Sequence, residues 1–318
     1  MRYLLLFLLV TMPLYAKTFT VQGPSQHMAG DLENPLMQPR WSPNGNVIAM
    51  TGDHYTGIQL YQLQDQNVIT LTSDRAAGFG LSWSPDGETI VSRVARFENK
   101  RRLNAIKLYR INQKNDRILL DYTPATPGLP AWTADGSAVL ALVNDEVELF
   151  AVSDIPTVQR IAPESPIPLV NGDEMIIVRG SDSGDRIVKT RTRSRILNAV
   201  LSPDGKKIAY EVYGGSMHVM NIDGSGDVDL GPGFRPRWHP DSKHLVYMIT
   251  RDDGHRITES DLYTIRIDGQ DKTRLQFSEN RLEMNPDWSP DGHWIAYDVS
   301  ELGAVYRVEV QGNEEVNQ

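Results

Sequence analysis

Apolar and polar residues alternate in short runs along most of this chain, and one turn phrase returns between consecutive runs. The phrase is an aromatic or leucine residue followed by Ser-Pro-Asp-Gly or a close variant, which fits a type I turn with a bulge. Its copies are Trp41-Ser-Pro-Asn-Gly45, Trp83-Ser-Pro-Asp-Gly87, Trp132-Thr-Ala-Asp-Gly136, Leu201-Ser-Pro-Asp-Gly205, Trp238-His-Pro-Asp-Ser242 and Trp288-Ser-Pro-Asp-Gly292. An apolar residue lies three places past each turn, and small or apolar residues two places further on continue a period of two. The pattern predicts a β-hairpin at every copy.

Two more runs follow most of these hairpins. The predicted third strands are Ile58–Leu63, Ile106–Ile111, Val147–Val152, Met217–Ile222, Leu262–Ile267 and Val305–Val310. The predicted fourth strands include Val68–Leu71, Ile118–Leu120, Val158–Ile161 and Thr273–Phe277. Four antiparallel strands that repeat at steps near forty residues are typical of a β-propeller. The aromatic residue of each phrase would then pack between neighbouring sheets, so we interpret it as a core residue.

One step in the repeat, between positions 132 and 201, is too long for a single unit. Pro168-Leu-Val-Asn-Gly172 keeps the proline, an apolar residue and the turn glycine of a worn copy. Met175–Val178, Ile187–Lys189 and Arg191–Ile196 could supply its remaining strands. Counting this unit, we predict an all-β fold, a seven-bladed β-propeller of four-stranded antiparallel blades with about 41 residues per step. Six blades with a long insertion is the alternative.

The last predicted blade lacks an outer strand, because only a polar tail, Gln311–Gln318, follows Val305–Val310. Thr18–Val21 lies ahead of the first blade and has the pattern of a strand. We expect this N-terminal strand to pair with the last blade and close the ring. Closure removes two sheet edges that would otherwise promote aggregation.

The first sixteen residues have the pattern of a secretory signal. Arg2 is followed by a hydrophobic stretch, Leu4–Met12, and Leu14-Tyr15-Ala16 is a plausible cleavage site. We therefore predict residues 1–16 as a signal peptide cleaved after Ala16, and residues 17–318 as a single β-propeller domain. The expected location is a bacterial periplasm, with no membrane span after signal cleavage. A retained membrane anchor is the alternative.

Composition narrows the possible functions. The chain has no cysteine, which excludes disulfides, thiolate metal sites and a cysteine nucleophile. A formal net charge of −9 argues against a nucleic-acid partner, whose binding depends on neutralised phosphates. Two basic clusters interrupt this acidity, and they are Lys100–Arg102 and the alternating set Lys189, Arg191, Arg193 and Arg195. The second cluster fits a solvated sheet edge, with an anionic partner surface as the alternative.

The turn copies resemble the propeller repeats of the TolB family, and the resemblance covers nearly all of residues 39–310. It rests on those copies together with Pro39, Pro130, Pro236, Pro286, the strands Lys207–Tyr210 and Trp294–Tyr297, and the turns Asp223-Gly224 and Asp268-Gly269. The resemblance implies a periplasmic, non-enzymatic binding protein, since TolB docks the peptidoglycan-associated lipoprotein at its propeller. TolB also has an α/β domain ahead of six blades. Only a short segment precedes the first blade here, so we expect a TolB-like relative without that domain.

Candidate binding residues are expected at one end of the central channel. Loops that precede the innermost strands and loops between second and third strands share one face of a propeller, here called the loop face. Ligands use such loops because they vary without disturbing the sheets. The predicted partner-binding residues are Arg40, His54, Arg235, Arg237 and Asp287. An arginine fork at the channel mouth suits capture of a carboxylate or phosphate, and a local ion pair is the alternative.

No catalytic constellation is apparent in the sequence, which has no Gly-Xaa-Ser-Xaa-Gly nucleophile elbow and no paired helical histidines. We therefore predict no catalytic residue, no cofactor and no metal site. A metal site built by His54, His239 and His255 stays open as an alternative.

The leading hypothesis is an exported, non-catalytic propeller that binds an envelope or periplasmic protein through its loop face and channel mouth. A propeller enzyme, such as a saccharide lyase or hydrolase, is the alternative, and a structural subunit of an envelope complex is a third possibility. We expect Arg40→Ala with Arg237→Ala to weaken partner binding with little change in stability. The sequence leaves the partner's identity and the oligomeric state open.

Overall fold

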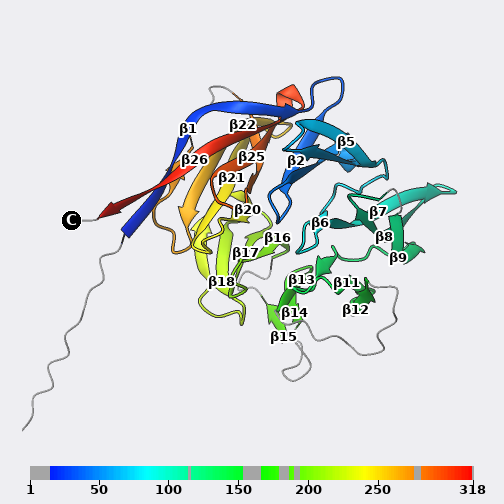
Figure 1. Ribbon diagram of the computed structural model, residues 1–318. Helices are drawn as coiled ribbons and strands as arrows, with labels where there is room; N and C mark the ends of the chain where they lie inside the picture. Colours follow the sequence, from blue (N-terminus) through cyan, green and yellow to red (C-terminus); the bar gives the residue numbers. More distant parts are fainter. Residues whose placement is uncertain are drawn as a thin grey trace, which may run out of the picture.

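The computed structural model describes residues 15–113, 116–152, 166–178, 186–189, 194–275 and 281–316. Within them almost all regular structure is β-strand, apart from two single turns of 3₁₀ helix, η1 (Asp53–Tyr55) and η2 (Ser300–Leu302). Figure 1 shows the strands as small sheets arranged around a common axis. Every strand pairing within these sheets is antiparallel, and sequence neighbours are sheet neighbours except where the ring closes.

The described residues form seven sheets. From the innermost strand outward, the first four are β2 (Leu36–Trp41), β3 (Val47–Gly52), β4 (Ile58–Gln62) and β5 (Asn67–Thr72); β6 (Ser82–Trp83), β7 (Thr89–Glu98), β8 (Arg101–Arg110) and β9 (Asp116–Thr123); β10 (Ala131–Trp132), β11 (Ala138–Val143) and β12 (Glu146–Ala151); and β13 (Ile167–Asn171), β14 (Glu174–Val178) and β15 (Arg186–Lys189). The other three are β16 (Ile196–Leu201), β17 (Lys207–Val212), β18 (Met217–Asn221) and β19 (Val228–Gly231); β20 (Phe234–Trp238), β21 (His244–Asp252), β22 (Ile257–Arg266) and β23 (Thr273–Arg274); and β24 (Glu283–Trp288), β25 (Trp294–Val299), β26 (Ala304–Val316) and β1 (Tyr15–Ala29).

The prediction of an all-β propeller of small antiparallel sheets is therefore confirmed. The prediction of seven equivalent four-stranded blades is wrong. Six sheets carry a copy of the turn phrase between their first two strands, so by the repeat the propeller has six blades. The β13–β15 sheet has no copy and fills the long step as the insertion of the six-blade alternative. It has three strands among the described residues, as has β10–β12.

The predicted fourth strand of the worn unit, Arg191–Ile196, is not part of that unit where the structure describes it. Ile196 opens β16 and pairs with Val212 of the next sheet. The buried side chain of Ile196 explains the difference, because it packs with the core residues Ile208 and Tyr210 of that sheet. The predicted strand Val158–Ile161 lies outside the described residues.

Each turn phrase is held by its own side chains. At the copy that begins at Trp83, the Ser84 hydroxyl donates to Asp86 Oδ1 at 2.5 Å and accepts the Thr89 N–H at 2.9 Å. Gly87 has φ +72°, a left-handed conformation that glycine adopts without a steric cost. The same hydroxyl-to-carboxylate or hydroxyl-to-amide bond recurs at Ser42, Thr133, Ser202 and Ser289. These bonds are local, which explains why the turns were predictable from the sequence.

The core consists of hydrophobic clusters that each bridge two neighbouring sheets. The tryptophans of the phrase belong to these layers. The indole N–H of Trp83 donates to the Arg40 carbonyl at 3.2 Å, and that of Trp132 donates to the Ser82 carbonyl at 3.0 Å. In both cases the acceptor directly precedes the tryptophan of the neighbouring sheet. Trp83 and Trp132 thus each fix one sheet against the next, as core residues.

The N-terminal strand closes the ring as predicted. β1 pairs with β26, with Thr18 opposite Asn313 and Val21 opposite Val310. The pairing extends beyond the predicted strand, because β26 continues through residues 311–316, which were expected to be a polar tail. No sheet edge is left on the outer side of β26 along this length.

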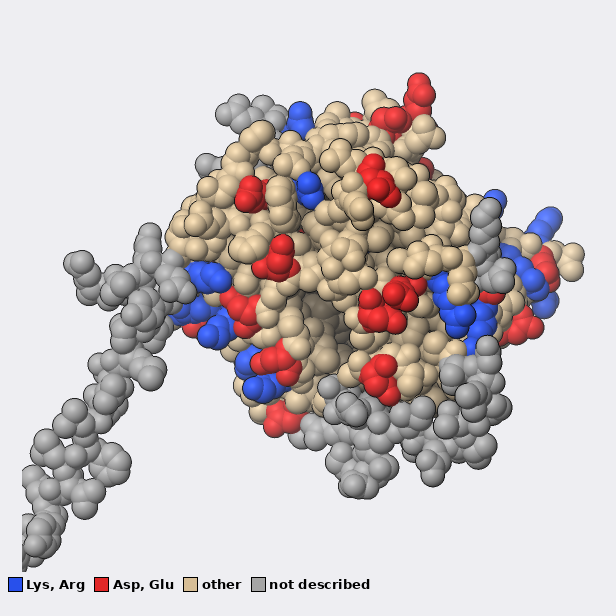
Figure 2. Space-filling model, in the orientation of Figure 1, with Lys and Arg blue, Asp and Glu red and all other residues tan. Residues whose placement is uncertain are grey.

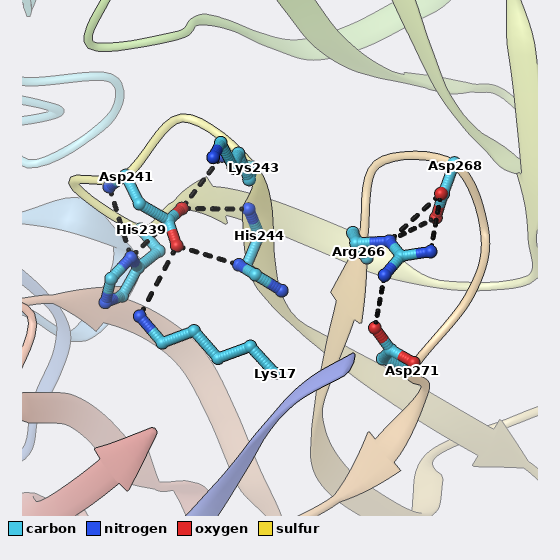
Figure 3. A network of polar contacts seen from close by, with 8 residues as sticks. All are labelled: Lys17, His239, Asp241, Lys243, His244, Arg266, Asp268 and Asp271. Carbon is cyan, nitrogen blue, oxygen red and sulfur yellow. Dashed lines mark hydrogen bonds and ion pairs between the residues drawn. The ribbon is translucent and has the colours of Figure 1, made fainter. Parts of the chain in front are cut away.

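Phe19 anchors β1 to β24 of its own sheet and to the neighbouring β20–β23 sheet. Its side chain is buried, and its ring lies 5.0 Å from that of His239, 5.3 Å from that of His244 and 5.1 Å from that of Trp288. Asp241 lies beside these rings, 2.8 Å from His244 Nδ1 and 3.6 Å from Lys17 Nζ (Figure 3). Although burial raises the pKa of Asp241, hydrogen bonds from His239 and His244 outweigh it and hold that pKa below its ordinary range. The start of β1 is therefore fixed by apolar and ionic contacts together.

Candidate functional site

A pocket of about 270 Å³ opens on the loop face, where the first and last sheets of the ring meet. Its lining includes Tyr55 from the loop between β3 and β4, Met284 at the start of β24, and Gly303 from the turn between β25 and β26. Loops of the two kinds expected on the loop face thus meet at one site. Figure 2 shows the surface hollowed near the middle of the view, with acidic side chains around the hollow.

Three of the predicted residues, Arg40, Arg237 and Asp287, come together across the ring closure. Asp287 Oδ1 lies 3.5 Å from Arg237 Nε, and the two side chains are only 14% and 19% exposed. Asp287 Oδ2 accepts the backbone N–H of Trp41 at 2.7 Å. Burial and the neighbouring Arg237 lower the pKa of Arg40 to about 9, while Arg40 also interacts with Asp287. Burial raises the pKa of Asp287 against the opposing effect of both arginines.

Arg235 lines the pocket and links β20 to the neighbouring β16–β19 sheet. Its Nη1 donates to Asn198 Oδ1 at 3.0 Å, and its backbone N–H donates to Glu211. Asn198 Nδ2 also donates to Glu211 Oε1, at 2.7 Å. Burial raises the pKa of Glu211, although these hydrogen bonds oppose the shift.

The channel mouth is thus a charge-balanced network. Its cations are Arg40, Arg235 and Arg237, and its carboxylates are Glu211, Asp287 and Asp298. These arginines interact with acidic groups of the protein itself, which was the alternative interpretation of the sequence. The expectation that Arg40→Ala with Arg237→Ala leaves stability nearly unchanged is therefore revised, because both side chains belong to a buried ionic contact.

His54 is placed differently from the other four. It lies in η1 with a left-handed φ of +54°, and its side chain is 90% exposed. Its Nε2 is 3.4 Å from Asp53 Oδ2, and Asp53 lines the pocket. His54 is therefore a residue of the pocket rim, outside the buried network.

The comparisons with known proteins bear on the fold. No family model matches the chain. An uncharacterized protein of Agrobacterium fabrum is 27% identical over 219 residues, which cover 66% of this chain and 64% of that protein. A protein TolB homolog of Chlorobium luteolum is 28% identical over 128 residues, which cover 38% of this chain and 28% of that protein. The chain thus matches less than two thirds of the length of each of these relatives.

Two solved structures resemble this one. TolB from Acinetobacter baumannii has a TM-score of 0.54 at 18% identity, over 80% of this chain and 57% of that chain. A putative TolB from Agrobacterium tumefaciens has a TM-score of 0.52 at 15% identity, over 94% of this chain and 99% of that chain. The fold is that of a TolB-like β-propeller. At these identities the structural likeness shows the fold alone.

Sequence analysis of this TolB-like propeller did not single out Glu211 or Asp298, and Asp298 of β25 is the one that lines the pocket. Asp298 is buried, and its Oδ1 accepts the Gln38 backbone N–H at 2.8 Å and Asn285 Nδ2 at 3.0 Å. It thereby joins the last sheet to the first and lines the pocket at the same time. Burial raises its pKa to about 6, because the hydrogen bonds and the charges of Arg40 and Arg235 only partly offset the desolvation.

A recurring backbone feature accompanies this contact. The residue three places before the aromatic or leucine of the phrase is left-handed in four sheets, and these residues are Gln38, Asn198, Arg235 and Asn285, with φ between +49° and +59°. The inner strand is bulged there, as the register shifts between β20 and β21 show. Asparagine at two of these places was an available signal, because it tolerates the left-handed region better than most residues.

Asp298→Asn is expected to change the pH dependence of stability. The folded pKa of about 6 exceeds the ordinary aspartate value of about 4, so wild-type stability falls as pH rises from about 4 through about 6. Asparagine keeps an acceptor but does not titrate. The variant should therefore gain about 1–3 kcal/mol relative to wild type between pH 4 and pH 7, measured by urea unfolding. Asp298→Ala, which leaves the Gln38 N–H without its acceptor, should instead cost about 1–3 kcal/mol. A stability difference between Asp298→Asn and wild type that stays constant with pH would contradict this account.

Exposed apolar side chains of the TolB-like propeller gather on the loop face. Among the described residues, seven large hydrophobic side chains are exposed, and five belong to loop-face segments. These are Leu32, Phe97, Leu129, Tyr213 and Phe234, exposed by 74, 59, 44, 71 and 39%. The other two, Val68 and Ile118, lie on the outer strands β5 and β9. Among the described residues, the loop face therefore carries most of the exposed large hydrophobic side chains.

The described residues hold no group of three or more His, Cys, Asp or Glu side chains suited to a metal ion. The metal alternative from the sequence needed His239 beside His54. Instead His239 is buried against Phe19 and Trp288 in the turn between β20 and β21, while His54 is exposed on the loop face. Among the parts of the chain described above, no helix is long and apolar enough to cross a membrane.

Proposed function

We propose that this TolB-like propeller is an exported, non-catalytic protein that binds a protein or another cell-envelope component through its loop face and channel mouth. The observation that carries the proposal is the gathering of five of seven exposed large hydrophobic side chains on that face. Apolar side chains collected on one face typically mark a protein partner. Loop residues can serve a partner without disturbing the sheets.

Several sequence features support the rest of the proposal. Residues 1–16 have the pattern of a signal peptide cleaved after Ala16, and residues 17–318 then form a single domain in the periplasm. The resemblance of the turn repeats to the TolB family, together with the sequence match to a protein TolB homolog, supports an envelope protein as the partner. In this proposal Arg235 and His54 contact the partner, while Arg40, Arg237 and Asp287 position the channel mouth.

A propeller enzyme that acts on an exported saccharide is the alternative, and it would depend on Asp298. A pKa raised to about 6 by burial suits a general acid. However, Oδ1 of Asp298 already accepts a hydrogen bond from Gln38 across the ring closure and another from Asn285 of its own sheet. This engagement favours a structural role for Asp298 and a binding role for the pocket.

The test is capture of a partner from a detergent extract of the native cell envelope on immobilised full-length mature protein. The triple variant Leu32→Ser, Tyr213→Ser and Phe234→Ser removes apolar side chains from the loop face. We expect this variant to capture about tenfold less partner than wild type, or less still. A tenfold change in affinity corresponds to about 1.4 kcal/mol of binding free energy. The control is Val68→Ser with Ile118→Ser, which removes exposed apolar side chains from outer strands and should capture as wild type does. Equal capture by all three proteins would overturn the proposed docking face, and release of saccharide fragments from the extract would favour the enzyme.

A further inference from the structure

The longest hairpin of the fold, β7–β8, extends beyond the strands that flank it. β6 pairs with β7 only through Ser82 and Trp83, and β9 pairs with β8 only as far as Asn104. Within the described residues, the segments 96–98 and 101–103 have register partners only in each other. Figure 1 shows β7 and β8 projecting past the neighbouring sheets. Residues 93–104 are here called the hairpin arm.

The hairpin arm has the opposite charge to the molecule as a whole. It contains five cations and one carboxylate, Glu98, which gives a local net charge of +4 in a chain of net charge −9. The five cations are Arg93, Arg96, Lys100, Arg101 and Arg102. Glu98 is engaged by Arg96 at 3.0 Å, and four of the five cationic residues are exposed. In Figure 2 basic side chains gather at the side of the view where Figure 1 places β7 and β8.

One side of the hairpin arm combines this charge with aromatic surface. Phe97 lies opposite Arg102 in the register, so the two side chains share a face. Phe97 is 59% exposed, and the Arg75 guanidinium lies 6.0 Å from its ring. The surface continues towards the pocket, because the Arg93 guanidinium lies 5.6 Å from the Phe79 ring and Phe79 packs 5.0 Å from Tyr55. Tyr55 lines the pocket. The arm and the pocket are therefore connected by a row of arginine and aromatic side chains.

We propose that the hairpin arm binds an acidic polypeptide segment of the docked partner. This inference rests on the proposed function and adds the chemistry of the partner. Arginine forks bind carboxylates in pairs, and arginine–aromatic surfaces accept extended chains. An added strand can also pair with segments 96–98 or 101–103, which have open edges among the described residues. The charge contrast steers such a segment to the arm, because the rest of the acidic surface repels it.

A lipid surface fits the hairpin arm less well. The tip of the hairpin arm is the two-residue turn Asn99-Lys100, which lies between the paired residues Glu98 and Arg101. Both turn residues have a left-handed backbone conformation. Phe97 lies behind this tip, so inserting Phe97 into a bilayer would first bury charged and polar side chains. A polypeptide can contact the arm along its length without that cost.

The test measures binding of a fluorescein-labelled peptide of glutamates to the full-length mature protein by fluorescence anisotropy. The arm variant is Lys100→Glu, Arg101→Glu and Arg102→Glu, at exposed positions. The control variant has the same net charge as the arm variant and changes exposed positions at the ends of strands away from the loop face. Its substitutions are Arg110→Glu, Lys206→Glu and Lys243→Glu. We expect wild type and control to bind with similar Kd, and the arm variant to bind at least about tenfold more weakly. Wild-type affinity should fall as salt rises, because exposed charges are screened.

Each other outcome has a definite meaning. Equal binding by wild type and arm variant, equal weakening by the control, or no binding by wild type would overturn the proposal. Arm-dependent binding to phosphatidylglycerol vesicles without peptide binding would assign the arm to a membrane instead. The loop-face variant of Leu32, Tyr213 and Phe234 should still bind the glutamate peptide. If the glutamate peptide does not bind the arm but envelope capture still depends on the loop face, only this inference fails. If the peptide binds the arm but envelope capture does not depend on the loop face, only the proposed function fails.

Discussion

Phe19→Ala is expected to lower the free energy of unfolding by about 3–5 kcal/mol, the usual cost of emptying a buried phenylalanine site. Phe19 is 2% exposed and contacts three rings that belong to other strands, those of His239, His244 and Trp288. Its loss leaves a cavity where the last sheet packs on the β20–β23 sheet, and the contacts of His239 and His244 with Asp241 limit how far these rings can move into it. Urea unfolding followed by tryptophan fluorescence measures the effect.

The matched control for this change is Phe97→Ala, which deletes the same side chain from a position 59% exposed. We expect a change within about 0.5 kcal/mol there, as for most surface substitutions. Hydrogen exchange gives a second readout, because a loosened β1 should speed exchange in its partner β26 more than in β3. Equal destabilisation by the two variants would mean that Phe19 does not secure the ring closure.

The hairpins and the ring closure were predictable because local chemistry and simple pairing rules govern them. A Ser84 hydroxyl bonded to Asp86 two residues away is encoded in five consecutive residues. The pairing of Thr18 with the last blade followed from one missing outer strand and one spare strand. No long-range side-chain contact had to be known for either prediction.

The number of equivalent blades was harder to predict, since it depended on a unit that has lost the phrase. Met175 and Ile177 correctly indicated a strand, and both are buried in β14. Ile196 could serve either the worn unit or the next sheet by its pattern alone. The core around Ile208 decides this, and that packing follows from tertiary structure.

The candidate site was only half predictable from the sequence. The loop position of His54 followed from the topology of a propeller blade. Arg235 was also expected in a loop, but it lies at the start of the inner strand β20. By contrast, the contact between Asp287 and the backbone of Trp41 joins residues 246 positions apart. Such pairing depends on which side chains meet where the ring closes, and a single sequence does not reveal it. From the sequence, Arg40 was predicted to capture an anion of a partner. In the structure, its neighbours include carboxylates of the protein itself.

Asp287→Asn is expected to lower the free energy of unfolding by about 3–5 kcal/mol, because it leaves buried arginines without their carboxylate. Asparagine retains an acceptor for the Trp41 N–H, so the change isolates the charge. Arg237 lies 3.5 Å from the carboxylate and is 19% exposed, and Arg40 repels it. Adding Arg237→Gln to Asp287→Asn should recover part of the loss. The double-mutant cycle should give a coupling of at least about 1 kcal/mol in urea unfolding.

Burial, and not the presence of an ion pair, is the reason for this expected effect. Arg251 and Glu259 form a shorter pair of 3.1 Å, but their side chains are 76% and 60% exposed. Glu259→Gln should therefore change stability by less than about 1 kcal/mol, because water screens both charges in either state. If the Asp287 and Arg237 substitutions are additive, or if Glu259→Gln costs as much as Asp287→Asn, the channel mouth does not hold the ring together electrostatically. A large coupling at Asp287 with little effect at Glu259 would instead locate the ionic contribution to ring closure in the buried network.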